Sequence, residues 1–204
     1  MAATELTITV VIAFDASRAQ PRQTGSRWLR AGLPATWLHT YAAIWTATLG
    51  PAALVALAGP PLVDSVRHLL GLALTAQRNP PPSVGHVLAL AAHNIPIATW
   101  PLLLGVTGAH RHRLARRVAD TVVLACMIAN TLPVGAALGA YGTPLLAYLP
   151  QLPLEWAGLA LGASCWLVQR RRELTCRERL VWLALNAGVL LCAAAIETVV
   201  VPHR

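Results

Sequence analysis

Five apolar stretches of the chain are each long enough to cross a lipid bilayer as a helix. They lie near residues 37–59, 85–107, 119–140, 146–168 and 180–201. About 20 helical residues span a hydrocarbon core of about 30 Å. A backbone inside lipid must satisfy its own hydrogen bonds, which a helix does within one segment. The sequence therefore predicts an all-α, polytopic integral membrane protein with five transmembrane helices.

The composition supports this class and excludes others. Hydrophobic residues make up 56% of the chain and charged residues only 12%, which is too apolar for a soluble domain. The net charge of +8 comes from arginines in short clusters between the apolar stretches, so we expect no nucleic-acid partner. The four cysteines are scattered, which predicts neither a disulfide framework nor a thiolate metal site. We expect a multi-pass protein of a bacterial cell membrane, with the lipid bilayer as its surroundings.

The arginines alternate from one connecting segment to the next. Four lie before the first apolar stretch, and the later segments hold two, four, none, five and one. Because cytoplasmic loops carry the excess of basic residues, this order predicts a cytoplasmic N-terminus and an external C-terminus. We therefore expect a cytoplasmic tail over residues 1–36 and a five-helix membrane domain over 37–204, with an outer loop over 60–84.

The outer loop contains apolar residues at helical spacing, opposite Asp64, Arg67 and His68. Those apolar residues are Val63, Val66, Leu69, Leu70, Ala73 and Leu74. The pattern predicts a short helix that either lies on the outer membrane interface or packs across the ends of the other helices.

Two pairs of glycines at G-x-x-x-G spacing predict close contacts between helices. Gly135 and Gly139 lie in the third stretch, and Gly158 and Gly162 lie in the fourth. Such spacings let two helix backbones approach each other. They predict a compact bundle, and they also allow a homo-oligomer.

Five polar residues inside the apolar stretches form the candidate site. They are His93, Asn94, Asn130, Glu155 and Glu197. Counting about 1.5 Å per residue from the nearest cytoplasmic arginine places the two asparagines and two glutamates about 20–27 Å up. Four residues from four helices therefore share a depth in the outer half of the membrane.

Polar residues at this depth are costly, so each needs a partner or a task. One interpretation is a set of hydrogen bonds that hold the bundle together. The other is a polar cavity, open to the outer side, that binds a partner helix, a peptide or an ion. Metal binding by His93, Glu155 and Glu197, or hydrolysis by Ser164 with His93, lacks the usual ligand and nucleophile motifs. We therefore expect no enzyme activity, no metal and no cofactor.

Four stretches follow one another over about residues 85–202, namely "AAHNIPIATWPLLLGVTG", "ANTLPVGAALGAYG", "LPLEWAGLALGAS" and "AAAIETVVVP". Together, and in this order, they resemble the last four helices of the stage II sporulation protein M family of polytopic membrane proteins. The resemblance implies a non-enzymatic role. The namesake is a membrane anchor or scaffold for peptidoglycan-degrading partners, while relatives occur with export and with membrane proteins of circular-bacteriocin production or immunity.

The resemblance and the polar residues lead to one expectation of function. We expect a membrane scaffold or assembly factor that binds a membrane or extracytoplasmic protein partner at the outer face. The alternative is a small transporter, export or immunity component that uses the outer-half polar cavity.

Overall fold

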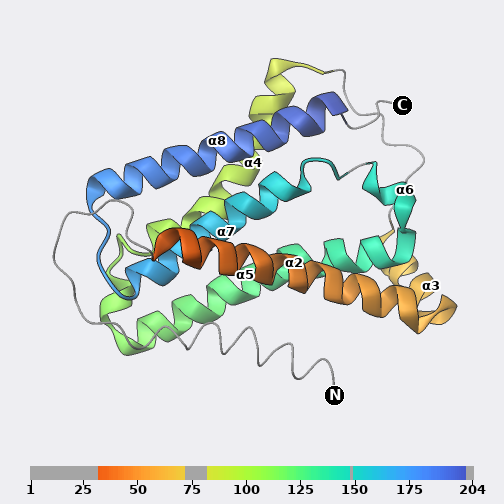
Figure 1. Ribbon diagram of the computed structural model, residues 1–204, viewed down its shortest axis with the longest axis horizontal. Helices are drawn as coiled ribbons and strands as arrows, with labels where there is room; N and C mark the ends of the chain where they lie inside the picture. Colours follow the sequence, from red (N-terminus) through yellow and green to blue (C-terminus); the bar gives the residue numbers. More distant parts are fainter. Residues whose placement is uncertain (1–31, 72–81, 148, 201–204) are drawn as a thin grey trace.

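The computed structural model describes residues 32–71, 82–147 and 149–200, and the regular secondary structure of these residues is all helical. The N-terminal arginines and part of the outer loop, including Ala73 and Leu74, lie outside the described residues. Within the described ranges there are seven α-helices, a short 3-10 helix and no strand (Figure 1). Their bounds are α2 Leu33–Ala58, α3 Pro60–Leu70, α4 Val84–Leu103, η2 Ala109–Arg111, α5 Arg113–Tyr141, α6 Thr143–Leu146, α7 Leu152–Gln169 and α8 Cys176–Val200.

Three of these helices, α2, α5 and α8, are long and apolar enough to cross a membrane. Only 17–28% of the residues in their most apolar stretches are buried within the protein. The remaining apolar side chains face outward, as expected where lipid replaces water around the protein. The structure is thus that of an all-helical membrane protein.

The other two long helices, α4 and α7, are shorter than α2, α5 and α8. They have 20 and 18 residues, and 13 of the 18 residues of α7 are buried. α7 packs against α2, α4 and α8, so its side chains contact protein more than they contact the surroundings. A helix in this position needs less hydrophobicity than one that faces lipid.

Prolines set where α7 begins. The sequence places the fourth stretch near 146–168, but the helix begins at Leu152, with a proline in its first turn. Residues 143–146 form the separate short helix α6. Pro150 and Pro153 lack a donor N–H, and a proline fits best in the first turn of a helix. The chain therefore breaks before Leu152.

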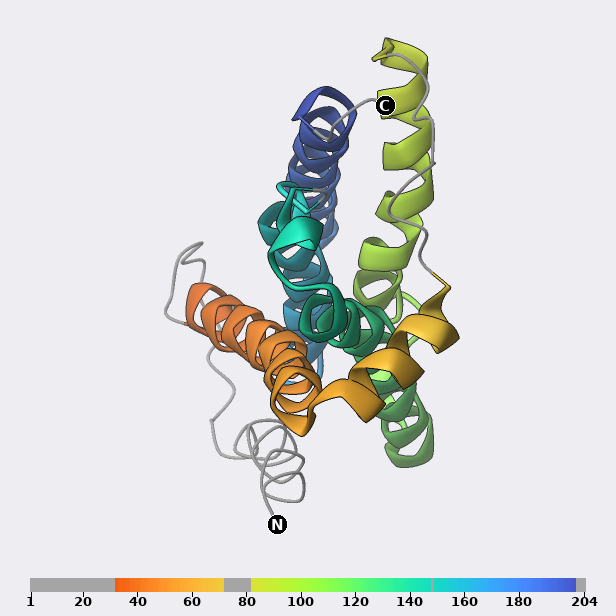
Figure 2. The same cartoon turned by 90° about the vertical axis from the view of Figure 1, so that its right-hand side faces the viewer.

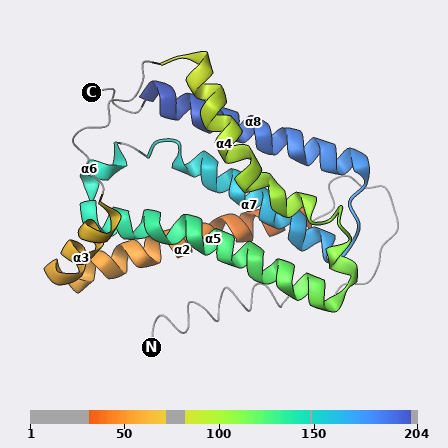
Figure 3. The same cartoon turned by 180° about the vertical axis from the view of Figure 1, so that it is seen from behind.

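Long helices that follow one another along the chain run in alternating directions (Figures 1 and 3). The indole of Trp37 donates to the Ala157 carbonyl at 3.2 Å, and the Tyr41 hydroxyl donates to the Pro153 carbonyl at 3.3 Å. Residue numbers rise along α2 while those of its partners in α7 fall, so these two helices are antiparallel.

The first glycine pair joins α5 to α2. A Cβ atom at Gly135 would lie 2.2 Å from the Thr48 carbonyl oxygen, and one at Gly139 would lie 2.4 Å from the Ala52 carbonyl oxygen. The residue numbers of the contacting partners rise together along the two helices, so α2 and α5 are parallel. The close helix contact predicted for this pair is confirmed.

The second glycine pair lies on α7, where it contacts two different helices. A Cβ atom at Gly162 would lie 1.8 Å from the Ala98 carbonyl oxygen of α4. One at Gly158 would meet the Leu190 side chain of α8 at 2.8 Å. The Asn186 amide, also on α8, donates to the same Ala98 carbonyl at 3.3 Å. Both glycine pairs are therefore occupied by helices of the same chain.

The short helix α3 lies across the end of α5 (Figure 2). The chain turns from α2 at Gly59, whose φ of 81° suits glycine. The Arg67 side chain then donates from Nε to the Ala140 carbonyl at 3.0 Å and lies 5.7 Å from the Tyr141 ring centre. Of the two arrangements predicted for this segment, the contact is the one expected for a helix packed across its neighbours.

The start of α8 is fixed by a capping box. Glu178 Oε2 accepts from the Thr175 backbone N–H at 2.8 Å, and Thr175 Oγ1 accepts from the Glu178 backbone N–H at 3.2 Å. This reciprocal pair satisfies two donors that the helix cannot satisfy internally.

The substitution Thr175→Ala is expected to lower the free energy of unfolding by about 1 kcal/mol, because it removes the cap. Thr175→Ser keeps the hydroxyl and should retain most of that stability. Unfolding of the purified protein in detergent micelles measures both. Equal losses in the two variants would show that the hydroxyl does not stabilise α8.

Candidate functional site

Asn94 of α4 and Glu155 of α7 meet as the shared depth predicts. The Asn94 amide donates to Glu155 Oε1 at 3.3 Å. Glu155 lies in the first turn of α7, and Asn94 lies near the middle of α4. Both side chains are partly buried. This contact joins two helices through polar groups that apolar surroundings would otherwise leave unsatisfied.

Glu197 of α8 adds a second carboxyl group to this site. It interacts electrostatically with Glu155 and with His86 of α4. Neither carboxyl has an ion pair with an arginine in the described part of the chain. Like charges in apolar surroundings repel strongly, and among the described residues His86 is a basic side chain that interacts with Glu197. We call Asn94, Glu155, Glu197 and His86 the outer polar cluster.

The place of His86 beside Glu197 was not predicted from the sequence. His86 lies in the first turn of α4, beyond the depth shared by the asparagines and glutamates. The depth estimated from residue counts therefore does not group His86 with the asparagines and glutamates. The antiparallel packing of α4 and α8 brings it near Glu197, and no pattern within α4 alone reveals that pairing.

Asn130 and His93 occupy different positions from the outer polar cluster. The Asn130 amide donates to the Cys126 carbonyl at 2.8 Å, one turn earlier in α5. His93 is exposed on α4. The structure thus brings together three of the five candidate residues, which are Asn94, Glu155 and Glu197.

The described residues do not bring together the side chains considered for metal binding or for hydrolysis. Within the described ranges, no three His, Cys, Asp or Glu side chains form a group that could hold a metal ion. Ser164 is fully buried, and its hydroxyl has no hydrogen-bond partner among the described atoms. It is therefore not hydrogen-bonded to the exposed His93.

A second polar group, also missed from the sequence, joins α5 to α7. Asp120 accepts from the Trp166 indole N–H at 2.9 Å and pairs with Arg170 at 3.3 Å. The Asp120 and Arg170 side chains are 19% and 14% exposed, and Trp166 is fully buried. Because buried polar groups need partners, these three residues form one structural unit.

An exposed ion pair links η2 to the α7–α8 connection. Arg111 donates to Glu173 Oε1 from Nη2 at 2.6 Å and from Nε at 3.1 Å. The hydrogen bond from Arg111 lowers the pKa of Glu173 below its ordinary value. The ionised carboxylate is therefore favoured in the folded protein. The contribution of this pair is present at neutral pH and is lost as the pH falls through the lowered pKa.

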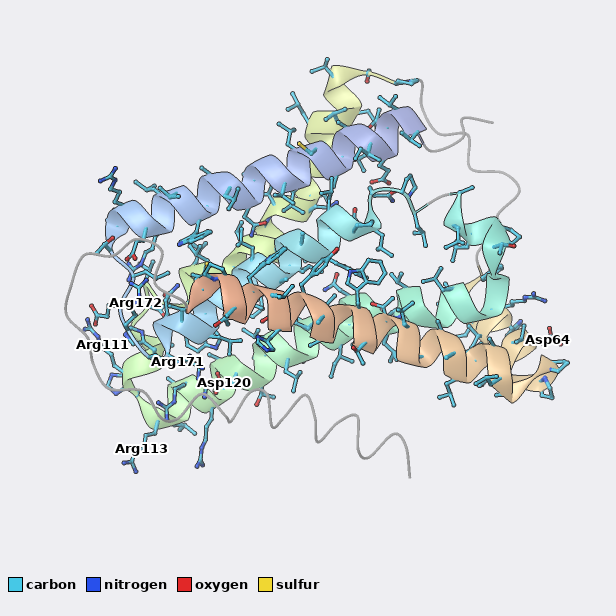
Figure 4. The ribbon with its side chains drawn as sticks, in the orientation of Figure 1. Asp64, Arg111, Arg113, Asp120, Arg171 and Arg172 are labelled. Carbon is cyan, nitrogen blue, oxygen red and sulfur yellow. The ribbon has the colours of Figure 1, made fainter. Side chains whose placement is uncertain are left out.

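Several arginines gather at one end of the molecule. Figure 4 shows Arg111, Arg113, Asp120, Arg171 and Arg172 together at one end, with Asp64 at the other.

Comparison with protein-family models, with curated proteins and with solved structures finds no match to the chain. The outer polar cluster and the arginine-rich end are therefore the two features from which a function can be inferred.

Proposed function

We propose that the chain is a five-helix, multi-pass protein of a bacterial cell membrane, with its N-terminus in the cytoplasm and its C-terminus outside. The alternating directions of α2, α4, α5, α7 and α8 support five crossings. The arginines gathered at one end support a cytoplasmic position for that end, because basic residues are retained on the cytoplasmic side. α4 and α7 would be the second and fourth spans.

Within this topology, the chain acts as a non-enzymatic scaffold or assembly factor that binds a partner protein at the outer face. The observation that carries this proposal is the outer polar cluster, where Asn94 and Glu155 meet at 3.3 Å beside Glu197. Glu155 and Glu197 are only partly buried, so their carboxyl groups can accept hydrogen bonds from a partner. This is also the role implied by the resemblance to the stage II sporulation protein M family.

A transport, export or immunity component is the second candidate function. It is favoured by the proximity of two carboxyl groups from different helices, with His86 beside them. Ionisable residues inside membrane segments commonly mark ion or proton pathways. The two functions place different demands on the cluster, because a scaffold needs contact with a partner and a transporter needs passage through the bundle.

The variants Glu155→Gln and Glu197→Gln separate the two functions. For a scaffold, each variant is expected to reduce partner capture about tenfold, because a hydrogen bond to a charged group is lost. Capture is measured by crosslinking in native membranes followed by mass identification. Glu173→Gln removes a carboxylate at the other end of the molecule and should leave capture unchanged.

Intact capture combined with lost movement of a solute across vesicles would contradict the scaffold function and favour a transporter. Lower thermal stability in detergent as the sole effect would reduce the cluster to a structural role. Topology is tested by single cysteines at positions 150–160. We expect labelling from the outer side, and labelling from the cytoplasmic side would overturn the proposed orientation.

A further inference from the structure

The arginine-rich end carries more positive charge than its own acidic residues can neutralise. Residues 109–120 and 169–180 contain nine arginines and three acidic residues. Each of the three acids is bound to one arginine. The pairs are Asp120 with Arg170, Glu173 with Arg111, and Glu178 with Arg172. These two segments therefore retain a net charge of +6.

Three of the remaining arginines lie close together at the start of α5. Arg113, Arg116 and Arg117 occupy its first five residues. None of them has an acidic partner among the residues that the structure describes. Arg171, two residues past the end of α7, lies at the same end of the molecule as Arg113 in Figure 4. A cluster of guanidinium groups at one surface attracts anions, and phosphate oxygens accept two guanidinium N–H groups at once.

Apolar residues beside these arginines indicate which kind of anion suits this surface. Leu114 and Val118 alternate with the arginines on α5 and are 76% and 55% exposed. On α8, Leu180 is 60% exposed at the same end. Such side chains suit the hydrocarbon boundary, whereas a surface for a soluble acidic protein would not need them. This mixture of arginines and exposed apolar side chains is the one expected at the level where lipid headgroups meet the acyl chains.

We propose that this end of the molecule is a docking surface for the phosphate groups of anionic lipids, with Arg113, Arg116 and Arg117 as its main contacts. The surface lies at the opposite end from the outer polar cluster and goes beyond the proposed function. Anionic lipid would neutralise charge that the chain leaves unpaired and would hold the ends of α5 and α8 at the membrane surface.

The full-length protein, purified in detergent, is titrated with phosphatidylglycerol or with phosphatidylcholine, and bound lipid is counted by native mass spectrometry. We expect the wild type to prefer phosphatidylglycerol and the preference to weaken with added salt. Affinity for phosphatidylglycerol should fall about fivefold for each arginine replaced by glutamine at positions 113, 116 and 117. Arg67→Gln is the matched control for Arg117→Gln, because it removes one charge from the other end, and it should keep the wild-type affinity.

Four results would overturn the proposal. The first two are equal binding of the two lipids by the wild type and unchanged affinity for phosphatidylglycerol in the triple variant. The third is stabilisation of the wild type by inorganic phosphate that equals its stabilisation by phosphatidylglycerol. The fourth is capture of a polyglutamate peptide in phosphatidylcholine nanodiscs without any effect of phosphatidylglycerol. The last result would indicate an acidic protein partner. If the triple variant does not fold, the three single variants supply the same comparison.

Discussion

Replacing Gly162 with alanine is expected to lower the free energy of unfolding by about 3 kcal/mol. The added methyl group would lie 1.8 Å from the Ala98 carbonyl oxygen, where no atom can be accommodated. The obstacle belongs to the backbone, so no side chain can rotate away, and α4 must separate from α7. That movement also weakens the hydrogen bond from Asn186 to the Ala98 carbonyl.

Gly188 supplies the matched control on α8. A Cβ atom there would meet nothing within 4 Å. Because alanine favours a helix over glycine by about 1 kcal/mol, Gly188→Ala should be neutral or stabilising. Both variants are measured by denaturant unfolding in the same detergent micelles. Similar stabilities for Gly162→Ala and Gly188→Ala would show that α4 and α7 do not touch as described.

The close approaches share a relation to the prolines inside the helices. Thr48 lies three residues before Pro51, and Ala98 lies three residues before Pro101. Each proline lacks the N–H that would bond to the carbonyl four residues before it, so it removes the hydrogen bond to the residue preceding Thr48 or Ala98. The carbonyl of Thr48 meets Gly135, whose replacement by alanine would place a Cβ atom 2.2 Å away. The glycines therefore allow these close contacts, and each contact lies beside a helix turn in which a proline removes one hydrogen bond.

The helical architecture and the glycine contacts could be predicted because they depend on local patterns. Length and apolar composition indicate a membrane helix, and G-x-x-x-G places two glycines on one helix face. The composition of the candidate site could be predicted only in part. Counting residues gives the depth of Asn130, but it does not give the direction in which the side chain points. Asn130 donates to its own helix, whereas Asn94 reaches Glu155.

Some signals were present in the sequence but carried too little information alone. Thr175 and Glu178 have the spacing of a capping box, which an arginine-rich connection obscures. Asp120 is a different case, because its partners lie 46 and 50 residues away in the sequence, on α7 and directly after it. Only the packing of α5 against α7 reveals that this acid, near the start of a long apolar helix, is shielded and paired.

Replacing Asp120 with alanine is expected to lower the free energy of unfolding by about 3 kcal/mol. The change removes the acceptor of the buried Trp166 indole and the counter-charge of the largely shielded Arg170. Both groups then stay away from water without this partner, and leaving a buried polar group unsatisfied costs more than the bond itself contributes. Denaturant unfolding in micelles gives the loss.

The exposed pair between Arg111 and Glu173 is the control for this result. Its side chains are 64% and 57% exposed, so solvent screens the attraction and Glu173→Gln should leave the unfolding midpoint nearly unchanged. The variant Trp166→Phe keeps most of the ring but lacks the indole N–H. Asp120→Ala should therefore cost less in the Trp166→Phe background than in the wild type. Equal costs in the two backgrounds would mean that the indole does not depend on Asp120, and the stabilising role of this unit would then belong to Arg170 alone.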